Sequence, residues 1–436
     1  MPSGAGPACD QAPLRGAGPC AAAGSGPPLP LRSGPGDTQP AKGASPPADL
    51  SLVIVAGEAS GDMAGAALAA ALRRRAPAAR MQGIGGRRMR EQGVELLSDS
   101  SGWGAIGVAD SLSRIPRVWR ALRQLRRRIE EDGPSAIVLI DSGAVNVPLL
   151  RMIRRADISK LYYMPPGSWS RRPRSQELPD LVDGIATPFP WSRDLLAGRQ
   201  ARVEWVGHPV VEIARPQLSR AEAYERYAIS PDRPVVALAP GSREQEMRHV
   251  LPVLAAVAAI IARERPEAQF VVSVSDAVYQ NTIAKAFRRL EVAAMLLNGM
   301  EYDALQLADV AAVCSGTATL EFACLRLPMV IVYRVRALTA MQLVLFRRLV
   351  GRQQWAGMPN IIANKEIVPE FLGRSARPER IARELLSLLA DRPRRERMQA
   401  DLAGVGEALG DGHASERTAD LLMSLIAGRL ARKRAA

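Results

Sequence analysis

Most of this chain alternates short apolar runs with helix-forming stretches, and turns rich in small residues separate the two. Strands that alternate with helices form parallel sheets joined by right-handed crossovers. The alternation runs twice, which predicts an α/β protein with two doubly wound, Rossmann-like parallel sheets in succession. The predicted strands are Leu52–Val55, Ala136–Ile140, Lys160–Tyr163, Val235–Ala239, Phe270–Val274, Val310–Val313 and Met329–Val332.

Changes in composition divide the chain into four parts. Residues 1–49 are mostly Gly, Pro, Ala and Ser, so they are predicted to be a disordered leader. The first sheet domain is predicted over 50–207 and the second over 208–425, followed by a basic tail over 426–436. Because such sheets bind ligands beyond the carboxyl ends of their strands, the chemistry is predicted in a cleft between the two domains.

The charge balance favours anionic partners. The formal net charge is +14 at pH 7, and the leader contributes none of it. A field of this sign attracts nucleotide phosphates, nucleic acid or an anionic membrane surface. Aromatic residues are not clustered on a basic strand face, which argues against nucleic acid. The 4 cysteines and 3 histidines show no metal-ligand spacing, so no metal site is predicted and a reducing compartment is expected.

Two loops of small residues in the second half predict a phosphate site. Each follows an apolar strand and opens a helix, whose first N–H groups and partial positive charge favour phosphate. Arg243 adds a forked, permanently charged clamp, and Glu321 is placed to accept hydrogen bonds from a ribose. The alternative is a pair of ordinary tight turns. The predicted nucleotide-diphosphate site comprises Gly241, Ser242, Arg243, Ser315, Gly316, Thr317, Ala318, Thr319 and Glu321.

Asp141 is the first candidate for acid–base chemistry. It ends an apolar strand, where a carboxylate can take a proton from an attacking hydroxyl. The alternative is a cap for the next helix.

The loop Gly57–Asp62 lacks the spacing of a dinucleotide fingerprint and the lysine of a P-loop. Since Glu58 would repel a phosphate, this loop is predicted to face a sugar or acceptor.

No Asp-x-Asp pair occurs in the chain. Without a metal, an enzyme that breaks a sugar–diphosphate bond must neutralise the leaving group with helix N-termini and arginine. Both are present, so metal independence is predicted and no cofactor is expected.

The stretch from Ile106 to Ile129 is an amphipathic helix with many arginines outside its apolar stripe. Basic residues beside an apolar stripe that contains Trp suit a helix lying in a membrane interface. The alternative is a core-facing helix with a solvated basic face. Leu338–Val350 is a second, weaker candidate. The predicted membrane contacts are Val108, Leu112, Ile115, Val118, Trp119 and Leu122.

From about Leu52 to about Leu425, the chain resembles the lipid-A-disaccharide synthase family of inverting GT-B glycosyltransferases. The resemblance implies transfer of diacylglucosamine from UDP-2,3-diacylglucosamine to 2,3-diacylglucosamine 1-phosphate. The products would be the β-1,6-linked lipid A disaccharide 1-phosphate and UDP. The matching stretches are Ala56–Asp62, Gly83–Gly86 with Arg88 and Met89, Ile140 and Asp141 with Asn146, Val206–Pro209, Pro240–Arg243 with Glu246, Ser315–Glu321, Pro328–Val330 with Tyr333 and Arg334, and Pro359 and Asn360.

The resemblance also assigns roles by position. Asp141 matches the proposed general base, Arg243 an essential arginine of the UDP site, and Asn360 falls in the UDP-binding half. A cytoplasmic protein held peripherally at the inner membrane is implied, and a homodimer is a candidate assembly. The residues expected on the acceptor side are Glu58, Ser60, Asp62, Asn146 and Trp169.

Two segments depart from the family pattern, both in the acceptor half. Asp141–Asn146 reads Asp-Ser-Gly-Ala-Val-Asn where the family has Asp-x-Pro-Asp-Phe-Asn. Pro165–Arg171 replaces Ser-Pro-Ser-Val-Trp-Ala-Trp, so one Trp becomes a charge. A divergent GT-B relative acting on another UDP-sugar or acceptor, and a non-catalytic nucleotide-sugar binder, therefore stay open as alternatives.

Overall fold

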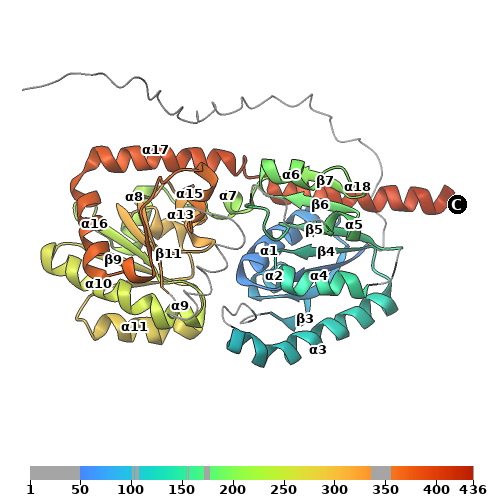
Figure 1. The fold of residues 1–436 in the computed structure, drawn as a ribbon, viewed down its shortest axis with the longest axis horizontal. Coiled ribbons are helices and arrows are strands. Elements are labelled where there is room, and N and C mark those ends of the chain that lie inside the picture. The colour runs from blue at the N-terminus through green and yellow to red at the C-terminus, as the bar shows by residue number, and fades with distance from the viewer. Residues whose placement is uncertain are drawn as a thin grey trace, which may run out of the picture. The chain divides into compact units, whose positions relative to one another are not determined.

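The structure is a computed structural model that describes residues 50–100, 103, 108–153, 155, 157–170, 177–334 and 355–435. Between Val108 and Ile115 it describes the backbone helix alone. The predicted leader and the second membrane candidate, Leu338–Val350, lie outside the described residues. Two parallel sheets with helices on their faces organise the rest (Figure 1).

Sheet A is seven-stranded and parallel, with strand order β3-β2-β1-β4-β5-β6-β7. Leu52 and Ile54 of β1 pack on one face, whereas Val53 and Val55 pack on the other. Its strands are β1 (Ser51–Ala56), β2 (Arg80–Gly85), β3 (Glu95–Asp99), β4 (Ala136–Ile140), β5 (Ser159–Tyr163), β6 (Gly184–Thr187) and β7 (Arg202–Trp205). The helices of this part are α1 (Ala59–Arg75), α2 (Arg87–Glu91), α3 (Val108–Asp132), α4 (Gly143–Met152), α5 (Leu178–Leu181) and α6 (Pro190–Leu196).

Sheet B is six-stranded and parallel, with strand order β10-β9-β8-β11-β12-β13. Its strands are β8 (Val235–Ala239), β9 (Gln269–Val274), β10 (Met295–Asn298), β11 (Val310–Cys314), β12 (Met329–Tyr333) and β13 (Glu370–Leu372). The helices of this part are α7 (Val210–Ile213), α8 (Arg220–Tyr227), α9 (Glu244–His249), α10 (Leu251–Glu264), α11 (Gln280–Arg288), α12 (Tyr302–Leu305), α13 (Ala318–Cys324), α15 (Met358–Ala363), α16 (Pro378–Ala390) and α17 (Arg392–Ala408).

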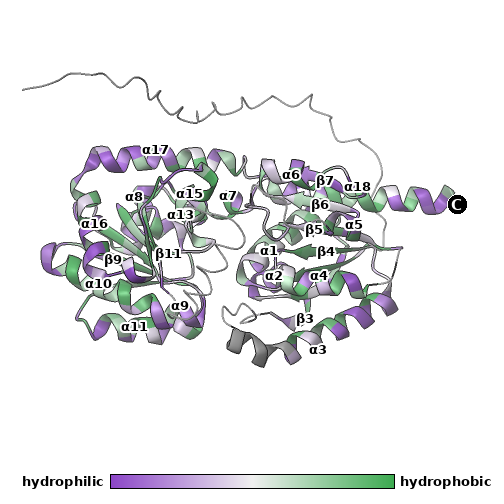
Figure 2. Ribbon diagram, in the orientation of Figure 1, coloured by the Kyte–Doolittle hydropathy of each residue, from purple (hydrophilic) through white to green (hydrophobic). Residues whose placement is uncertain are grey.

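The two-sheet fold predicted from the sequence is confirmed, and so is each predicted strand. These strands are buried on both faces, which is why they read as apolar runs. Among them, β4 is coloured hydrophobic in Figure 2. The pattern missed β2, β3, β6, β7, β10 and β13. Three of these strands, β6, β7 and β10, have only four residues, and β3 and β7 are partly exposed edge strands.

The last helix corrects the predicted domain boundary. α18 runs unbroken from Ala414 to Ala435, so 426–436 is not a separate tail as far as the described residues reach. Its buried residues Ala419, Leu422 and Ile426 belong to the core of sheet A rather than that of sheet B. The chain therefore returns to its first domain at the end. Little in the sequence indicates that α18 packs on sheet A, because the residues in contact lie far apart in the chain.

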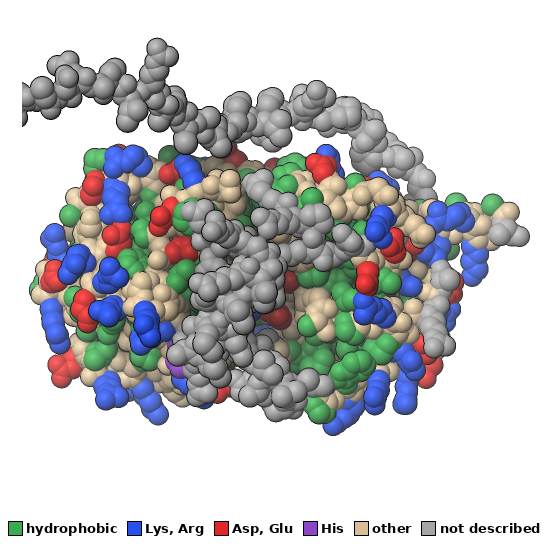
Figure 3. Space-filling model, viewed as in Figure 1, with side chains coloured by type: hydrophobic (Ala, Val, Ile, Leu, Met, Phe, Trp, Pro, Cys, Tyr) green, Lys and Arg blue, Asp and Glu red, His purple; other side chains and the backbone are tan. Residues whose placement is uncertain are grey.

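Basic side chains are spread over the visible face of the molecule rather than gathered in one patch (Figure 3). Many of them pair locally with acids, as Arg248 does with Glu244. None of the helices within the described residues is both long enough and apolar enough to cross a membrane.

Candidate active site

The strand order places one pair of loops at the switch point of sheet A. β1 and β4 are neighbours, and Ala56 lies opposite Ile140, so the loops that follow meet at the carboxyl edge. Such switch points are where open α/β sheets bind ligands. The approach is close, because a Cβ added to Gly57 would lie 2.6 Å from Ser142 Oγ.

Asp141 sits in that edge with an unusual backbone. Its φ is 52° and that of Ser142 is 27°, a region that side chains other than Gly seldom occupy. The Tyr162 hydroxyl donates to the Asp141 carbonyl at 2.6 Å. The Asn146 side-chain amide donates to the carbonyls of Ile140 at 2.9 Å and Asp141 at 3.2 Å. These bonds hold the backbone of the left-handed turn at Asp141.

Asn146 was predicted to contact the acceptor, and this is wrong for the structure described. Its side chain is fully buried and its amide nitrogen is occupied by two backbone carbonyls. Asn146 shapes the backbone of Asp141 instead.

The Asp141 carboxyl is suited to act as a base. Burial and, to a smaller extent, the charge of Glu58 raise its pKa, whereas the Ser60 hydroxyl, the Ser142 amide and Arg243 lower it, and the net result is a pKa of about 6. The Ser60 Oγ donates to Asp141 Oδ2 at 3.2 Å. At pH 7 the carboxylate is thus mainly ionised and more basic than an exposed one, as general-base catalysis requires.

Asp62 is a structural cap rather than an acceptor contact, which corrects the prediction. Its carboxylate accepts from the backbone N–H groups of Gly86 at 2.7 Å, Arg88 at 3.1 Å and Met89 at 3.1 Å. The residue is only 8 % exposed. It satisfies the first amides of α2, as a carboxylate at a helix start does.

A second pair of loops lies at the switch point of sheet B. β8 and β11 are neighbours, with Val313 opposite Ala239, so the loops predicted to hold phosphate do share one edge. In the first loop, however, Glu246 Oε2 already accepts from the amides of Ser242 at 2.7 Å and Arg243 at 3.1 Å. Gly241, with φ 112°, leaves room for that carboxylate. The prediction that these amides are free for phosphate is therefore wrong for the structure described.

Arg243 reaches from sheet B to the sheet A loops. Its guanidinium lies 2.8 Å from Glu58 Oε2 and 3.4 Å from Glu246 Oε1. The side chain keeps 29 % of its exposure, so a ligand can still reach it. Burial lowers the pKa of Arg243, but Glu58 and Glu246 outweigh it and hold the pKa above its usual range.

The loop after β11 is the more open of the two. Ser315, Gly316, Thr317 and Ala318 are partly exposed, and a Cβ at Gly316 would meet open space. Thr319 is fully buried and its hydroxyl donates to Gly316 O at 2.7 Å, so it shapes the loop and is not a ligand contact. That corrects the prediction for Thr319.

Glu321 lies one turn into α13, as predicted, but it is only 3 % exposed. The Tyr302 hydroxyl donates to its Oε2 at 2.6 Å. Burial raises the pKa of Glu321, and the bond from Tyr302 and the charge of Arg88 oppose the rise. Its role toward a ribose stays a prediction.

Asn360 was predicted in the UDP site, and the structure makes it part of the scaffold instead. It has no exposed surface. Its Nδ2 donates to Val368 O at 2.8 Å and Glu370 Oε1 at 2.9 Å. Its Oδ1 accepts from the amides of Ile367 at 2.8 Å and Val368 at 3.0 Å. Every hydrogen-bonding position of the side chain is thus filled from within the protein.

Comparison with known proteins identifies the family. The model of the family described as lipid-A-disaccharide synthetase matches residues 52–421. The chain belongs to this family. It is 37 % identical over 366 residues to a lipid-A-disaccharide synthase of Geobacter sulfurreducens, covering 84 % of this chain and 94 % of the relative. The corresponding protein of Syntrophus aciditrophicus is 33 % identical over 372 residues, with 84 % and 95 % covered. The family's role is lipid A disaccharide synthesis, and its enzyme class is hexosyltransferase.

Solved structures support the GT-B fold. A UDP-GlcNAc 2-epimerase from Neisseria meningitidis superposes with a TM-score of 0.57 at 13 % identity, covering 86 % of this chain and 100 % of that chain. The glycosyltransferase of kitacinnamycin gives a TM-score of 0.56 at 14 % identity, with 87 % and 99 % covered. At such identities the similarity concerns the fold alone.

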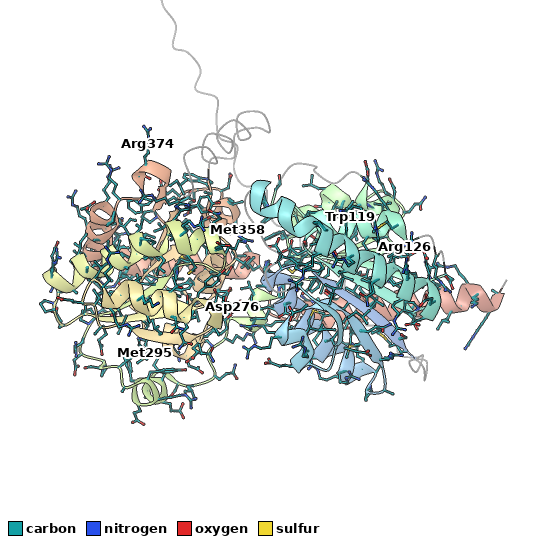
Figure 4. All side chains as sticks on the ribbon, turned by 90° about the horizontal axis from the view of Figure 1, so that it is seen from below. Trp119, Arg126, Asp276, Met295, Met358 and Arg374 are labelled. Atoms are coloured by element: carbon teal, nitrogen blue, oxygen red, sulfur yellow. The ribbon has the colours of Figure 1, made fainter. Side chains whose placement is uncertain are left out.

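In this lipid-A-disaccharide synthase family member, the apolar stripe of the amphipathic helix α3 is buried in its C-terminal part and partly exposed around Trp119. Leu122 is 2 % exposed and packs in the core with Leu125 and Ile129, so the predicted membrane contact at Leu122 is wrong. Trp119 is 40 % exposed, and Val118 is half-buried against the same core. Figure 4, seen from below, labels Trp119 and Arg126 on this helix. The side chains of Val108, Leu112 and Ile115 lie outside the described residues.

Trp169 and His208 both lie against the core cluster that includes Phe189. Trp169 is half-buried and packs against the core that includes Phe189 and Val210. Its acceptor role stays a prediction. His208 is buried, its Nδ1 accepts from Val210 N at 3.1 Å, and burial lowers its pKa to about 3, so it is neutral and structural.

Sequence reasoning assigned no role to three residues that shape the site: Tyr162, Glu246 and Glu370. Glu370 accepts from the amides of Ala356 at 2.9 Å and Gly357 at 2.8 Å, which fixes the loop before α15. Glu246 offered a signal, because it stands three residues after Arg243, the spacing of a capping box. Tyr162 and Glu370 offered none, since their partners are distant in sequence.

Proposed function

We propose that this protein transfers the 2,3-diacylglucosamine unit of UDP-2,3-diacylglucosamine to 2,3-diacylglucosamine 1-phosphate. The products are the β-1,6-linked disaccharide 1-phosphate and UDP, with inversion at the anomeric carbon and without a metal ion. One observation carries the proposal beyond family membership. A carboxyl with a pKa of about 6, Asp141, stands beside Glu58, which is paired with Arg243 of the other sheet.

The reaction needs three tasks from these residues. Asp141 takes the proton of the acceptor 6-hydroxyl as that oxygen bonds to the donor's anomeric carbon. The bond from that carbon to the diphosphate oxygen breaks, and its electron pair leaves with UDP. Arg243 and the amides of Gly316, Thr317 and Ala318 stabilise the departing charge, the role that helix starts and arginines serve in such sites.

A different acceptor is the second candidate function, and one contact favours it. A Cβ at Gly143 would lie 2.8 Å from Pro166 Cγ, so the two segments that depart from the family pattern touch each other. The first segment begins with Asp141, and the Asp141 amide donates to Tyr163 O at 3.0 Å, two residues before the second segment. Their changes therefore add up to one altered surface beside the proposed base, where an acceptor with other acyl chains would be selected.

Peripheral attachment to an anionic membrane surface on the cytoplasmic side completes the proposal. Trp119 is exposed on α3 between the exposed arginines Arg117, Arg120 and Arg123. An exposed Trp among basic residues suits the interface of an anionic bilayer, where diacylated substrates reside. Pairing of two copies stays a prediction.

A UDP-release assay with both diacylated substrates tests the proposal. The expected result is UDP and a disaccharide phosphate, identified by mass spectrometry, with the rate unchanged by EDTA. UDP-N-acetylglucosamine should be a poor donor. Binding of UDP without any release from either donor would contradict the transferase and favour a nucleotide-sugar binder. Release with a different acyl acceptor alone would favour the second candidate.

A further inference from the structure

Glu58 has a position that the proposed reaction does not use. It precedes α1 as its N-cap residue, where a carboxylate usually accepts an amide of its own helix, yet its side chain makes no such bond. Its Oε2 lies 2.8 Å from the Arg243 guanidinium instead. A residue of the sheet A loop is thus ion-paired with the residue that the proposed function assigns to the donor's diphosphate.

The ion pair between Arg243 and Glu58 remains accessible to solvent. The side chains of Arg243 and Glu58 keep 29 % and 33 % of their exposure. Partly exposed ion pairs contribute little net stability, so an incoming ligand of higher charge can displace one partner. A diphosphate offers more charge than a carboxylate and matches the arginine fork in two-point contact.

Glu58 also stands next to the proposed base. Ser60, two residues further on, donates to Asp141 Oδ2 at 3.2 Å. The charges and hydroxyls that face Asp141 come from every adjoining element. They are Glu58 and Ser60 at the start of α1, Tyr162 of β5 and Arg243 at the start of α9. Glu58 therefore touches Arg243 directly and acts on Asp141 through space.

We propose that Glu58 occupies Arg243 in the ligand-free enzyme in place of the donor's diphosphate and surrenders it when the donor binds. This inference rests on the proposed function and deepens it. Once the diphosphate takes Arg243, Glu58 loses its counter-ion and its full charge faces Asp141. The base then holds a proton more strongly when a donor is present than when it is absent. Glu58 is a positioning residue that couples the two ends of the reaction.

Calorimetric titration with UDP tests the first half on the full-length chain. Glu58→Gln keeps the shape of the side chain but removes its charge, and Glu244→Gln is the matched control. Glu244 directly follows Arg243, at the start of α9, and its carboxylate pairs with Arg248 rather than with Arg243. Glu58→Gln should bind UDP about 5-fold more tightly than the unchanged protein, the factor expected for release of one partly exposed ion pair. Glu244→Gln should stay within about twofold.

The pH dependence of kcat at saturating donor tests the second half. Glu58→Gln should move the acid limb to lower pH and lower the donor KM, whereas Glu244→Gln should move neither. Glu58→Asp separates the two effects, because it keeps the charge near Asp141 but is too short to reach Arg243. It should tighten UDP binding and leave the limb in place.

Three outcomes would count against the inference. Equal or weaker UDP binding by Glu58→Gln overturns it alone, while the donor site stands. An acid limb that does not move in Glu58→Gln overturns the coupling to Asp141. Absence of UDP binding by the unchanged protein and by each variant overturns the donor site of the proposed function, and this inference with it.

Discussion

The carboxyl edges of sheet A and sheet B are built on the same strand order but use their polar groups differently. At sheet A, Asp141 stands in a strained turn with a desolvated, reactive carboxyl. At sheet B, Glu246 accepts from the amides of the first loop, Glu370 from amides before α15, and Asn360 from amides after α15. The edge of sheet A therefore presents a carboxyl for proton transfer, whereas the loops at the edge of sheet B are fixed by internal hydrogen bonds.

Under the proposed function, this difference indicates how the two halves divide the catalytic work. A base must be destabilised to be useful, and its cost is carried by the surrounding structure. A leaving-group site must be preorganised, so that no reorganisation is needed when charge develops. Arg243 is the link between the two edges, because it belongs to the rigid one and contacts the reactive one.

The largest effect is expected from the reactive edge. Asp141→Asn should lower turnover by about 10²- to 10⁴-fold, the usual contribution of general-base catalysis. The UDP dissociation constant should stay within about twofold, because the donor loops are not touched. UDP release and calorimetry measure the two quantities. Ser60→Ala, which removes only a hydrogen bond to the same carboxyl, is the matched control and should cost far less. Unchanged turnover in Asp141→Asn would contradict the role of Asp141 as general base and so the difference proposed between the two sheet edges.

Arg243→Ala should lower kcat/KM for the donor by about 10²- to 10³-fold, since one preorganised donor to a developing anion is worth that much. Arg243→Lys should recover part of this loss, because the charge remains but the fork does not. Steady-state kinetics with varied donor measures both variants. If Arg243→Ala were as active as the unchanged protein, Arg243 would have no role in stabilising the leaving diphosphate.

Asn360→Ala probes the frame itself. The substitution leaves buried amides and carbonyls without partners, so the free energy of unfolding should fall by about 2–4 kcal/mol. Chemical denaturation measures it. Asn281→Ala is the control, because it removes an exposed side-chain amide from α11 and should not lower the free energy of unfolding. If Asn360→Ala kept its stability and lost UDP affinity, Asn360 would be a ligand contact after all.

Asp141 should also lower stability in a pH-dependent way. Its pKa rises from 3.8 to about 6 on folding, so the ionised form is disfavoured in the folded state. The cost is fully present above pH 6 and disappears as the pH falls toward 3.8. Asp141→Asn should therefore be more stable than the unchanged protein by about 1–3 kcal/mol at pH 8 and equal to it near pH 4. Thermal unfolding at both pH values measures the gap, and a gap that does not depend on pH would contradict it.

The smallest effect concerns the basic helix of sheet A. Trp119→Ser should weaken binding to vesicles of anionic phospholipid by about 3- to 10-fold, because one exposed ring contributes roughly 1 kcal/mol of insertion. Val278→Ser removes an apolar side chain that is 69 % exposed in the other half, and it should change nothing. Co-sedimentation with vesicles measures both. Equal weakening by the two variants would place the membrane contact elsewhere.

The sequence predicted the central strands of both sheets because fully buried strands must be continuous apolar runs. It also placed Asp141, which directly follows such a run, and Arg243, which stands in the short loop after another, at carboxyl edges. It did not separate ligand contacts from scaffold. Asn360, Thr319 and Asp62 are polar residues in loops, as ligand contacts are, and only their partners in space show that they are already satisfied. The return of α18 to sheet A was hidden for the same reason.

The pH dependence of kcat/KM for the donor, which reports ionisation in the ligand-free enzyme, tests the central claim most directly. The account predicts a single-proton decline below about pH 6, the pKa of Asp141, and loss of that decline in the residual activity of Asp141→Asn. A rate that stays constant down to pH 5 would contradict it. So would a decline that persists unchanged without the Asp141 carboxyl.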